Sequence, residues 1–136
     1  MNFRKYQKED RDQLINLWKI VFPDDPPHNE PSKVIDQKRR IADLIFIAEN
    51  GNKLVGGCMA GYDGHRGWLY AVAVLPEFRR NNIGQALVKQ AMESLKSLGC
   101  IKVNLQIRST NTVVASFYES LGFFPEDRLI MGAFIE

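Results

Sequence analysis

The pattern of apolar and polar positions is clearest between Trp68 and Leu98. An uninterrupted apolar run from Trp68 to Leu75 is too short to cross a membrane and predicts a buried strand. Pro76 ends this strand, because proline has no N–H to donate to a neighbouring strand. After a polar turn, residues 83–98 carry apolar side chains at helical spacing. The pattern therefore predicts a strand, a turn and a long helix in succession.

The part of the chain before Trp68 predicts a short strand, two helices and a hairpin. Pro23 ends the first helix, Ser32 is the expected N-cap of the second, and Asn50-Gly51 is a typical hairpin turn. The expected strands are residues 3–6, 44–49 and 53–62, and the expected helices are residues 9–22 and 32–41.

The part after Leu98 predicts a strand, a helix and a last strand. Strict alternation over Lys102–Arg108 indicates a half-buried strand, expected to be parallel to the Trp68 strand because a crossover helix joins the two. A helix from residue 111 or 112 to 121 and a strand over Leu129–Ile135 follow. The element order β-α-α-β-β-β-α-β-α-β predicts an α/β (α+β) fold. We expect one domain over residues 1–136, with a mixed, mostly antiparallel central sheet flanked by helices.

Composition narrows the classes of function without naming one. A net charge of +2 over 136 residues is too small to indicate binding to nucleic acid or to a membrane surface. The first residues lack the apolar segment of a secretory signal. Cys58 and Cys100 have no metal-binding spacing, which is typical of free thiols in a reducing compartment. We expect a cytoplasmic protein without a metal, either a monomer or a homodimer.

The turn between the Trp68 strand and the long helix is suited to binding phosphate. Arg79 and Arg80 lie beside the free N–H groups and the positive end of the helix. Gly84 allows close approach of a ligand, and Asn82 tolerates a left-handed backbone. The residues match neither a P-loop nor a Rossmann fingerprint. On this motif alone, a purely structural turn remains an equal alternative.

Two motifs together resemble those of the GCN5-related N-acetyltransferase (GNAT) family. The first is a strand ending in V-x-P followed by [Q/R]-x-x-G-x-[G/A], which here corresponds to Val74–Pro76 and Arg79–Gly84. The second is an asparagine followed by a helix that contains F/L-Y-E-x-x-G-F, here Asn111 and Phe117–Phe123. The resemblance covers nearly the whole chain. Among family members, the chain looks most like the ribosomal-protein N-terminal alanine acetyltransferases.

The resemblance implies an acyltransferase that uses acetyl-CoA as co-substrate and acetylates a primary amine. The amine would belong to a small molecule, a protein N-terminus or a lysine. It implies that the backbone of Val72, Ala73 and Val74 holds the pantetheine arm and the acetyl carbonyl. Tyr118 would be the general acid that protonates the departing CoA thiolate. The remaining residues implied to contact the cofactor are Arg79, Arg80, Asn81, Asn82, Ile83, Gly84, Gln85 and Asn111.

Two positions depart from the family pattern. Asn82 replaces the first motif glycine, which is a mild change. Gln106 stands where the ribosomal-protein acetyltransferases have a glutamate that acts as general base, and an amide cannot accept a proton at neutral pH. The general base is therefore unknown. The candidates by chemistry alone are Glu49, Asp63 and His65, with Tyr70 as a weaker one.

Alternatives stay open at three places. Gln106 is compatible with a catalytically silent, CoA-binding regulatory module, or with a partner-binding domain that keeps only the fold. Tyr118 argues for catalysis, although its place on an apolar stripe also fits a core aromatic. The proline-rich segment Pro23–Pro31 is either a stiff surface loop or a substrate-side loop. In the second case Asp24, Asp25, His28 and Glu30 would offer charge to a cationic acceptor.

Overall fold

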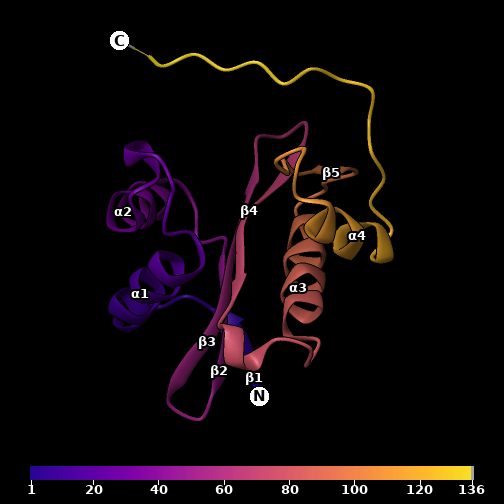
Figure 1. Cartoon of the computed structure of the whole chain (residues 1–136). Helices are drawn as coiled ribbons and strands as arrows, with labels where there is room; N and C mark the ends of the chain where they lie inside the picture. Colours follow the sequence, from indigo (N-terminus) through magenta and orange to yellow (C-terminus); the bar gives the residue numbers. More distant parts are fainter. Residues whose placement is uncertain (136) are drawn as a thin grey trace. The chain divides into compact units, whose positions relative to one another are not determined.

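The computed structural model describes residues 1–135, which form two compact units, residues 1–106 and the residues from 107 onward (Figure 1). The strands of the first unit are β1 (Asn2–Lys5), β2 (Ile45–Asn50), β3 (Lys53–Tyr62), β4 (Gly67–Val74) and β5 (Val103–Asn104). Its helices are α1 (Arg11–Val21), α2 (Pro31–Ile41) and α3 (Ile83–Ser97), with short 3-10 turns at Lys8–Asp10, Pro27–Asn29 and Pro76–Phe78. The second unit contains α4 (Thr112–Ser120).

The five strands form one sheet in the order β1-β2-β3-β4-β5. The pairs from β1 to β4 are antiparallel, and β4 and β5 are parallel. The sequence therefore predicted the mixed, mostly antiparallel sheet and the parallel crossover correctly. The crossover through α3 is what places β5 beside β4, because two parallel strands cannot be joined by a hairpin.

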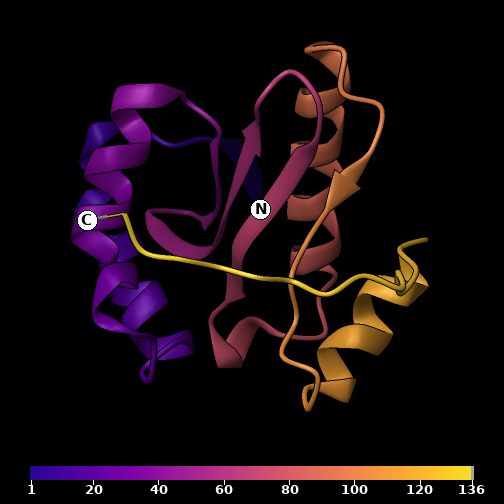
Figure 2. The ribbon, with the colours of Figure 1, turned by 90° about the horizontal axis from the view of Figure 1, so that it is seen from above.

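Helices cover both faces of the sheet. Figures 1 and 2 show α1 and α2 on one side of the strands and α3 on the other.

Neighbouring glycines of β3 allow both helical layers to come close to the sheet. A Cβ on Gly57 would lie 2.8 Å from Leu14 of α1, and a Cβ on Gly56 would lie 3.0 Å from Leu87 of α3. The glycines that weaken β3 in the sequence therefore mark close approach of the helices.

Three predicted details are wrong. The segment Leu129–Ile135 forms no strand, and Leu129 and Ile135 are 92% and 97% exposed. An apolar run forms a strand only where a neighbouring strand supplies hydrogen-bond partners, and the described part of the second unit contains none. The fifth strand covers two residues instead of Lys102–Arg108, because its pairing with β4 ends at Asn104. The N-cap of α2 is Glu30 instead of Ser32, since the Glu30 carboxylate accepts the free N–H groups.

A cluster of ion pairs fastens β1 to β2 and to the start of α1. The Arg4 guanidinium donates to both carboxylate oxygens of Asp10, each at 2.8 Å, and to both oxygens of Glu49, each at 3.0 Å. Asp10 is 6% exposed and also accepts a hydrogen bond from the backbone N–H of Gln7. The hydrogen bonds from Arg4 hold the pKa of Asp10 below its usual range.

We expect Asp10→Asn to lower the free energy of unfolding by about 2 kcal/mol at pH 7, since it removes a charge-assisted pair that is mostly buried. A lowered pKa in the folded state gives stability that is present above the ordinary carboxyl pKa of about 3.9 and is lost as the pH falls further. The difference in the free energy of unfolding between wild type and Asp10→Asn should therefore shrink between about pH 5 and pH 3. Urea unfolding across this pH range measures this difference. Asp43→Asn, which breaks the exposed Lys5–Asp43 pair, is the control and should change the free energy of unfolding little. A difference that stays constant down to pH 3 would contradict the role of the Asp10 charge.

Candidate functional site

One edge of β4 is left without a partner strand over most of its length. Pairing with β5 ends at Trp68 and Asn104, whereas pairing with β3 continues as far as Val74 and Gly56. Within residues 1–106, no strand pairs with the β5-facing edge of β4 after Trp68. An open edge of this kind presents backbone N–H and C=O groups to an extended ligand, which can bind as an added strand. The backbone of Val72, Ala73 and Val74 lies on this stretch.

A bulge interrupts β4 in the same stretch. Ala73 is opposite Gly57 and Tyr70 is opposite Met59, so that two residues of β4, Ala71 and Val72, oppose one residue of β3. Ala71 has a φ of +52°, which is unfavourable for a residue with a Cβ. Bulges bend a strand and redirect its backbone groups, and they are frequent next to active sites. The unpaired edge of β4 is therefore also the place where its backbone changes direction.

The turn that follows β4 leads directly into α3 and exposes backbone N–H groups. Arg80 and Asn82 have φ values of +68° and +60°, and turns of this kind form concave binding sites for anions. Asn82 is the N-cap of α3, but its side chain makes no capping hydrogen bond. The first N–H groups of α3 thus have no side-chain cap. The Nε of Arg79 donates to the carbonyl of Val74 at 3.2 Å, which fixes the turn to the end of the open strand.

The turn holds the residues that the sequence assigned to phosphate. Arg79 and Arg80 are exposed, and Gly84 is in the first turn of α3, next to the uncapped N–H groups. Asn82 adopts the left-handed backbone that the glycine of the family motif would allow. The side chain of Asn81 donates to the carbonyl of Phe78 at 3.2 Å and so stabilises the turn. Two arginines beside several free N–H groups are suited to a pyrophosphate.

The candidates for a general base are not gathered at one place. Glu49 lies on β2, where hydrogen bonds from Arg4 and Asn2 lower the pKa of its carboxyl. Asp63 lies in the turn between β3 and β4 and accepts hydrogen bonds from the N–H groups of His65 and Arg66, each at 2.8 Å, which lower its pKa. Both carboxylates therefore already have partners. His65 is exposed in the same turn as Asp63.

Tyr70 is the one candidate that lies on the unpaired stretch of β4, directly before the bulge. Its side chain is 43% exposed, and burial together with the charge of Asp63 raises the pKa of its hydroxyl. A phenol with a raised pKa stays protonated at neutral pH and is a hydrogen-bond donor, not a base. Gln106 is exposed beyond the end of β5. No carboxylate replaces the missing glutamate at that position.

The acidic loop after α1 is partly used for structure. The carboxylate of Glu30 accepts hydrogen bonds from the backbone N–H groups of Ser32 and Lys33 and from the Ser32 hydroxyl, so that Glu30 caps α2. Asp24, Asp25 and His28 are exposed in the same loop. Of the four charges considered for a cationic acceptor, Glu30 therefore already has a structural role.

The second unit contains the other two expected site residues, and we describe them within that unit. Asn111 is the N-cap of α4, and its side-chain oxygen accepts a hydrogen bond from the N–H of Val114 at 3.2 Å. Tyr118 is 8% exposed and packs edge-on against Phe117 and Phe123, with ring centroids 5.0 and 5.5 Å away. The aromatic rings on both sides hold the Tyr118 ring in one orientation.

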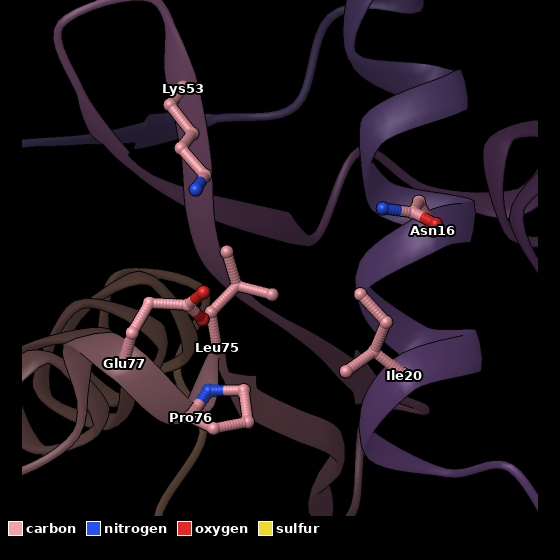
Figure 3. A pocket seen from close by; sticks show the side chains of 6 residues that line it. All are labelled: Asn16, Ile20, Lys53, Leu75, Pro76 and Glu77. Atoms are coloured by element: carbon pink, nitrogen blue, oxygen red, sulfur yellow. The ribbon is translucent and has the colours of Figure 1, made fainter.

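A cavity of about 340 Å³, which the sequence did not predict, opens beside the end of β4 (Figure 3). Asn16 and Ile20 of α1 face Leu75, Pro76 and Glu77 across this space, and Lys53 of β3 also lines it. Its lining combines apolar side chains with one ammonium group and one carboxylate. Three segments far apart in the chain build the cavity, so no local pattern could have indicated it.

The cysteines are not arranged for catalysis. Cys58 is fully buried in β3, and burial raises the pKa of its thiol to about 12. A thiol with this pKa is almost entirely protonated at neutral pH and is a poor nucleophile.

Among the described residues, no group of three or more His, Cys, Asp or Glu side chains is placed to hold a metal. No helix within residues 1–135 is long and apolar enough to span a membrane.

Comparisons with known proteins give a consistent result. The sequence profile of the acetyltransferase (GNAT) family matches residues 11–123. A protein of Sodalis glossinidius that is named as an acetyltransferase is 35% identical over 135 residues, which cover 96% of this chain and 92% of that protein.

Solved structures share the fold. A putative acetyltransferase from Agrobacterium tumefaciens has a TM-score of 0.80 at 23% identity, with 98% of this chain and 99% of that chain covered. The aminoglycoside N-acetyltransferase AAC(6')-Iy in complex with CoA has a TM-score of 0.80 at 21% identity, over 97% of this chain and 93% of that chain.

We expect Gly84→Leu to abolish measurable binding of acetyl-CoA, the ligand that the resemblance implies, because the new side chain would occupy the space beside the uncapped N–H groups of α3. Leucine is a good helix former, so α3 itself should persist. Isothermal titration calorimetry measures the affinity, and circular dichroism verifies the fold. Lys89→Leu, at an exposed position of the same helix, is the matched control and should bind normally. Unchanged affinity of Gly84→Leu would exclude this turn as the phosphate site.

Proposed function

The chain belongs to the GNAT acetyltransferase family and is an acetyl-CoA-dependent N-acetyltransferase, and we propose that it transfers the acetyl group directly from the thioester to a primary amine. The observation that carries this proposal is the open edge of β4, which continues through the turn into the uncapped start of α3. These segments adjoin in the sequence and offer backbone donors for an extended arm and then for a pyrophosphate. A solved protein with this fold is in complex with CoA.

In the proposed reaction, the neutral amine nitrogen attacks the thioester carbonyl and the carbonyl oxygen becomes an oxyanion. A backbone N–H of the Val72–Val74 stretch stabilises this oxyanion. The C–S bond then breaks, and Tyr118 gives a proton to the departing thiolate. The attacking nitrogen loses its proton to water, because Gln106 offers no base and Glu49 and Asp63 already accept hydrogen bonds. His65 lies in the turn between β3 and β4, not on the open stretch of β4. The contribution of the protein is mainly positioning and electrostatic stabilisation.

The acceptor belongs to the primary amines, and two observations bear on its class. The loop after α1 keeps Asp24 and Asp25 exposed, which favours a cationic molecule. The cavity near Leu75 offers an apolar surface with one carboxylate and one ammonium group. Acetylation of a ribosomal-protein N-terminus stays a prediction from the sequence. An assay of CoA release should compare N-terminal peptides, lysine peptides, polyamines and aminoglycosides.

A catalytically silent CoA-binding module is the alternative. Family membership and the names of the relatives favour catalysis, and the aromatic packing that orients Tyr118 supports a specific role for this residue. The two functions differ in outcome. Both predict that acetyl-CoA raises the melting temperature, but only the enzyme releases CoA in step with acetylation of an amine.

We expect Tyr118→Phe to lower kcat by at least about 100-fold, a loss typical of removing a general acid, because the thiolate then leaves unprotonated. The affinity for acetyl-CoA should stay close to the wild-type value, since the ring and its contacts with Phe117 and Phe123 are kept. Steady-state kinetics and calorimetry on the same preparation separate the two quantities. Full turnover in the variant would show that Tyr118 is not the acid.

We expect Cys58→Ala to keep kcat within about 2-fold of wild type, because direct transfer needs no acyl-cysteine intermediate. Stability should fall by about 1 kcal/mol, since a small buried group is removed from the core. Mass spectrometry of the wild-type protein mixed with acetyl-CoA should find no acetyl group on Cys58. A large loss of kcat, or an acetylated Cys58 that forms and decays at the turnover rate, would contradict direct transfer.

A further inference from the structure

Trp18 of α1 is hydrogen-bonded to the bulge of β4. Its indole N–H donates to the carbonyl oxygen of Ala71 at 3.0 Å, and its side chain is 3% exposed. Ala71 is the residue with a φ of +52°, at the point where two residues of β4 oppose Cys58 alone. A side chain from a different layer of the fold therefore holds the least favourable backbone conformation of this strand.

This hydrogen bond fixes the direction of a second backbone group. The described peptide bonds are all trans, so the carbonyl of Ala71 and the N–H of Val72 lie in one rigid plane and point in opposite directions. Because Trp18 holds the carbonyl toward α1, the N–H of Val72 points away from α1. Val72 lies on the stretch of β4 that has no partner strand on its β5 side. The indole thus sets where one donor of the open strand is aimed.

The hydrogen bond from Trp18 is needed because the left-handed backbone conformation is unfavourable for Ala71. A left-handed backbone at a residue with a Cβ costs free energy of the same order as one buried hydrogen bond contributes. Without the indole N–H, the partly buried carbonyl of Ala71 would lose its partner while the strain at φ remains. The peptide would then be driven to rotate toward a less strained arrangement. A rotation of this plane moves the N–H of Val72 by the same angle.

We propose that Trp18 is a positioning residue for acetyl transfer, which holds the Ala71–Val72 peptide so that the N–H of Val72 is aimed at the developing oxyanion. The inference rests on the proposed function and adds to it a residue that touches neither substrate nor cofactor. Trp18 does not contact the reacting carbon. Trp18 acts through one hydrogen bond and one rigid peptide plane.

The test is Trp18→Phe, which keeps an aromatic ring in the core but removes the N–H. We expect kcat to fall by at least about 10-fold, part of the loss that follows removal of an oxyanion donor, while KM for acetyl-CoA stays within about 3-fold. Ile35→Val, which trims a fully buried side chain of α2, is the control for a merely less stable core. This control should lower the melting temperature without changing kcat.

A second substitution tests the cause. Glycine adopts a positive φ without strain, so Ala71→Gly should keep the bulge conformation without the hydrogen bond from Trp18. The double variant Trp18→Phe with Ala71→Gly should therefore recover a clear part of the lost kcat. If Trp18→Phe does not fold, a benzothienylalanine at position 18 replaces the indole N–H with sulfur and keeps the shape of the ring. The same loss of kcat is expected from it.

One readout does not need turnover. In ¹H–¹⁵N spectra, the amide signals of Val72 should shift in Trp18→Phe, and their response to added CoA should be reduced. If the wild-type protein acetylates no amine, the proposed function fails and these spectra still decide whether Trp18 sets the Val72 amide. An unchanged Val72 signal, or wild-type kcat in a folded Trp18 variant, would overturn the inference.

Discussion

The separation of β4 from β5 is the constraint on which the rest of the structure depends. A strand inside a sheet normally satisfies its backbone groups on both sides, and β4 does so only as far as Trp68. Beyond that point, the sheet contains an open strand at an internal position, with α3 on one face and α1 on the other. Binding of an extended acyl carrier to this edge would complete the sheet. The affinity for the donor then comes largely from backbone groups, which tolerate many changes of side chain.

The open edge requires other features to hold its shape. The glycines of β3 let both helical layers approach the sheet, and this places Trp18 within reach of the bulge. Arg79 binds the carbonyl of Val74 and so fixes the turn relative to the strand end. At the opposite edge of the sheet, Arg4 connects β1, β2 and the start of α1. The strained backbone is thus supported by packing and by hydrogen bonds from side chains outside β4.

Local chemistry explains which features the sequence could predict. The strand before Pro76, the amphipathic α3, the hairpin at Asn50-Gly51 and the turn with Asn82 all follow from patterns within a few residues. The bulge at Ala71, the indole anchor of Trp18 and the cavity near Leu75 depend on segments far apart in the chain, so no local pattern reports them. The error at Leu129–Ile135 has the same origin. The apolar run shows that this segment is able to form a strand, but a strand also needs a partner, which the run itself does not report.

The most direct test of the central claim is amide hydrogen exchange of the intact protein with and without acetyl-CoA. We expect slower exchange at backbone N–H groups of residues 69–74 and of the turn through Gln85. We expect little change in β1 and β2, which lie away from the open edge. Binding of acetyl-CoA that leaves residues 69–74 unprotected would contradict the claim that the open edge of β4 holds the acetyl donor.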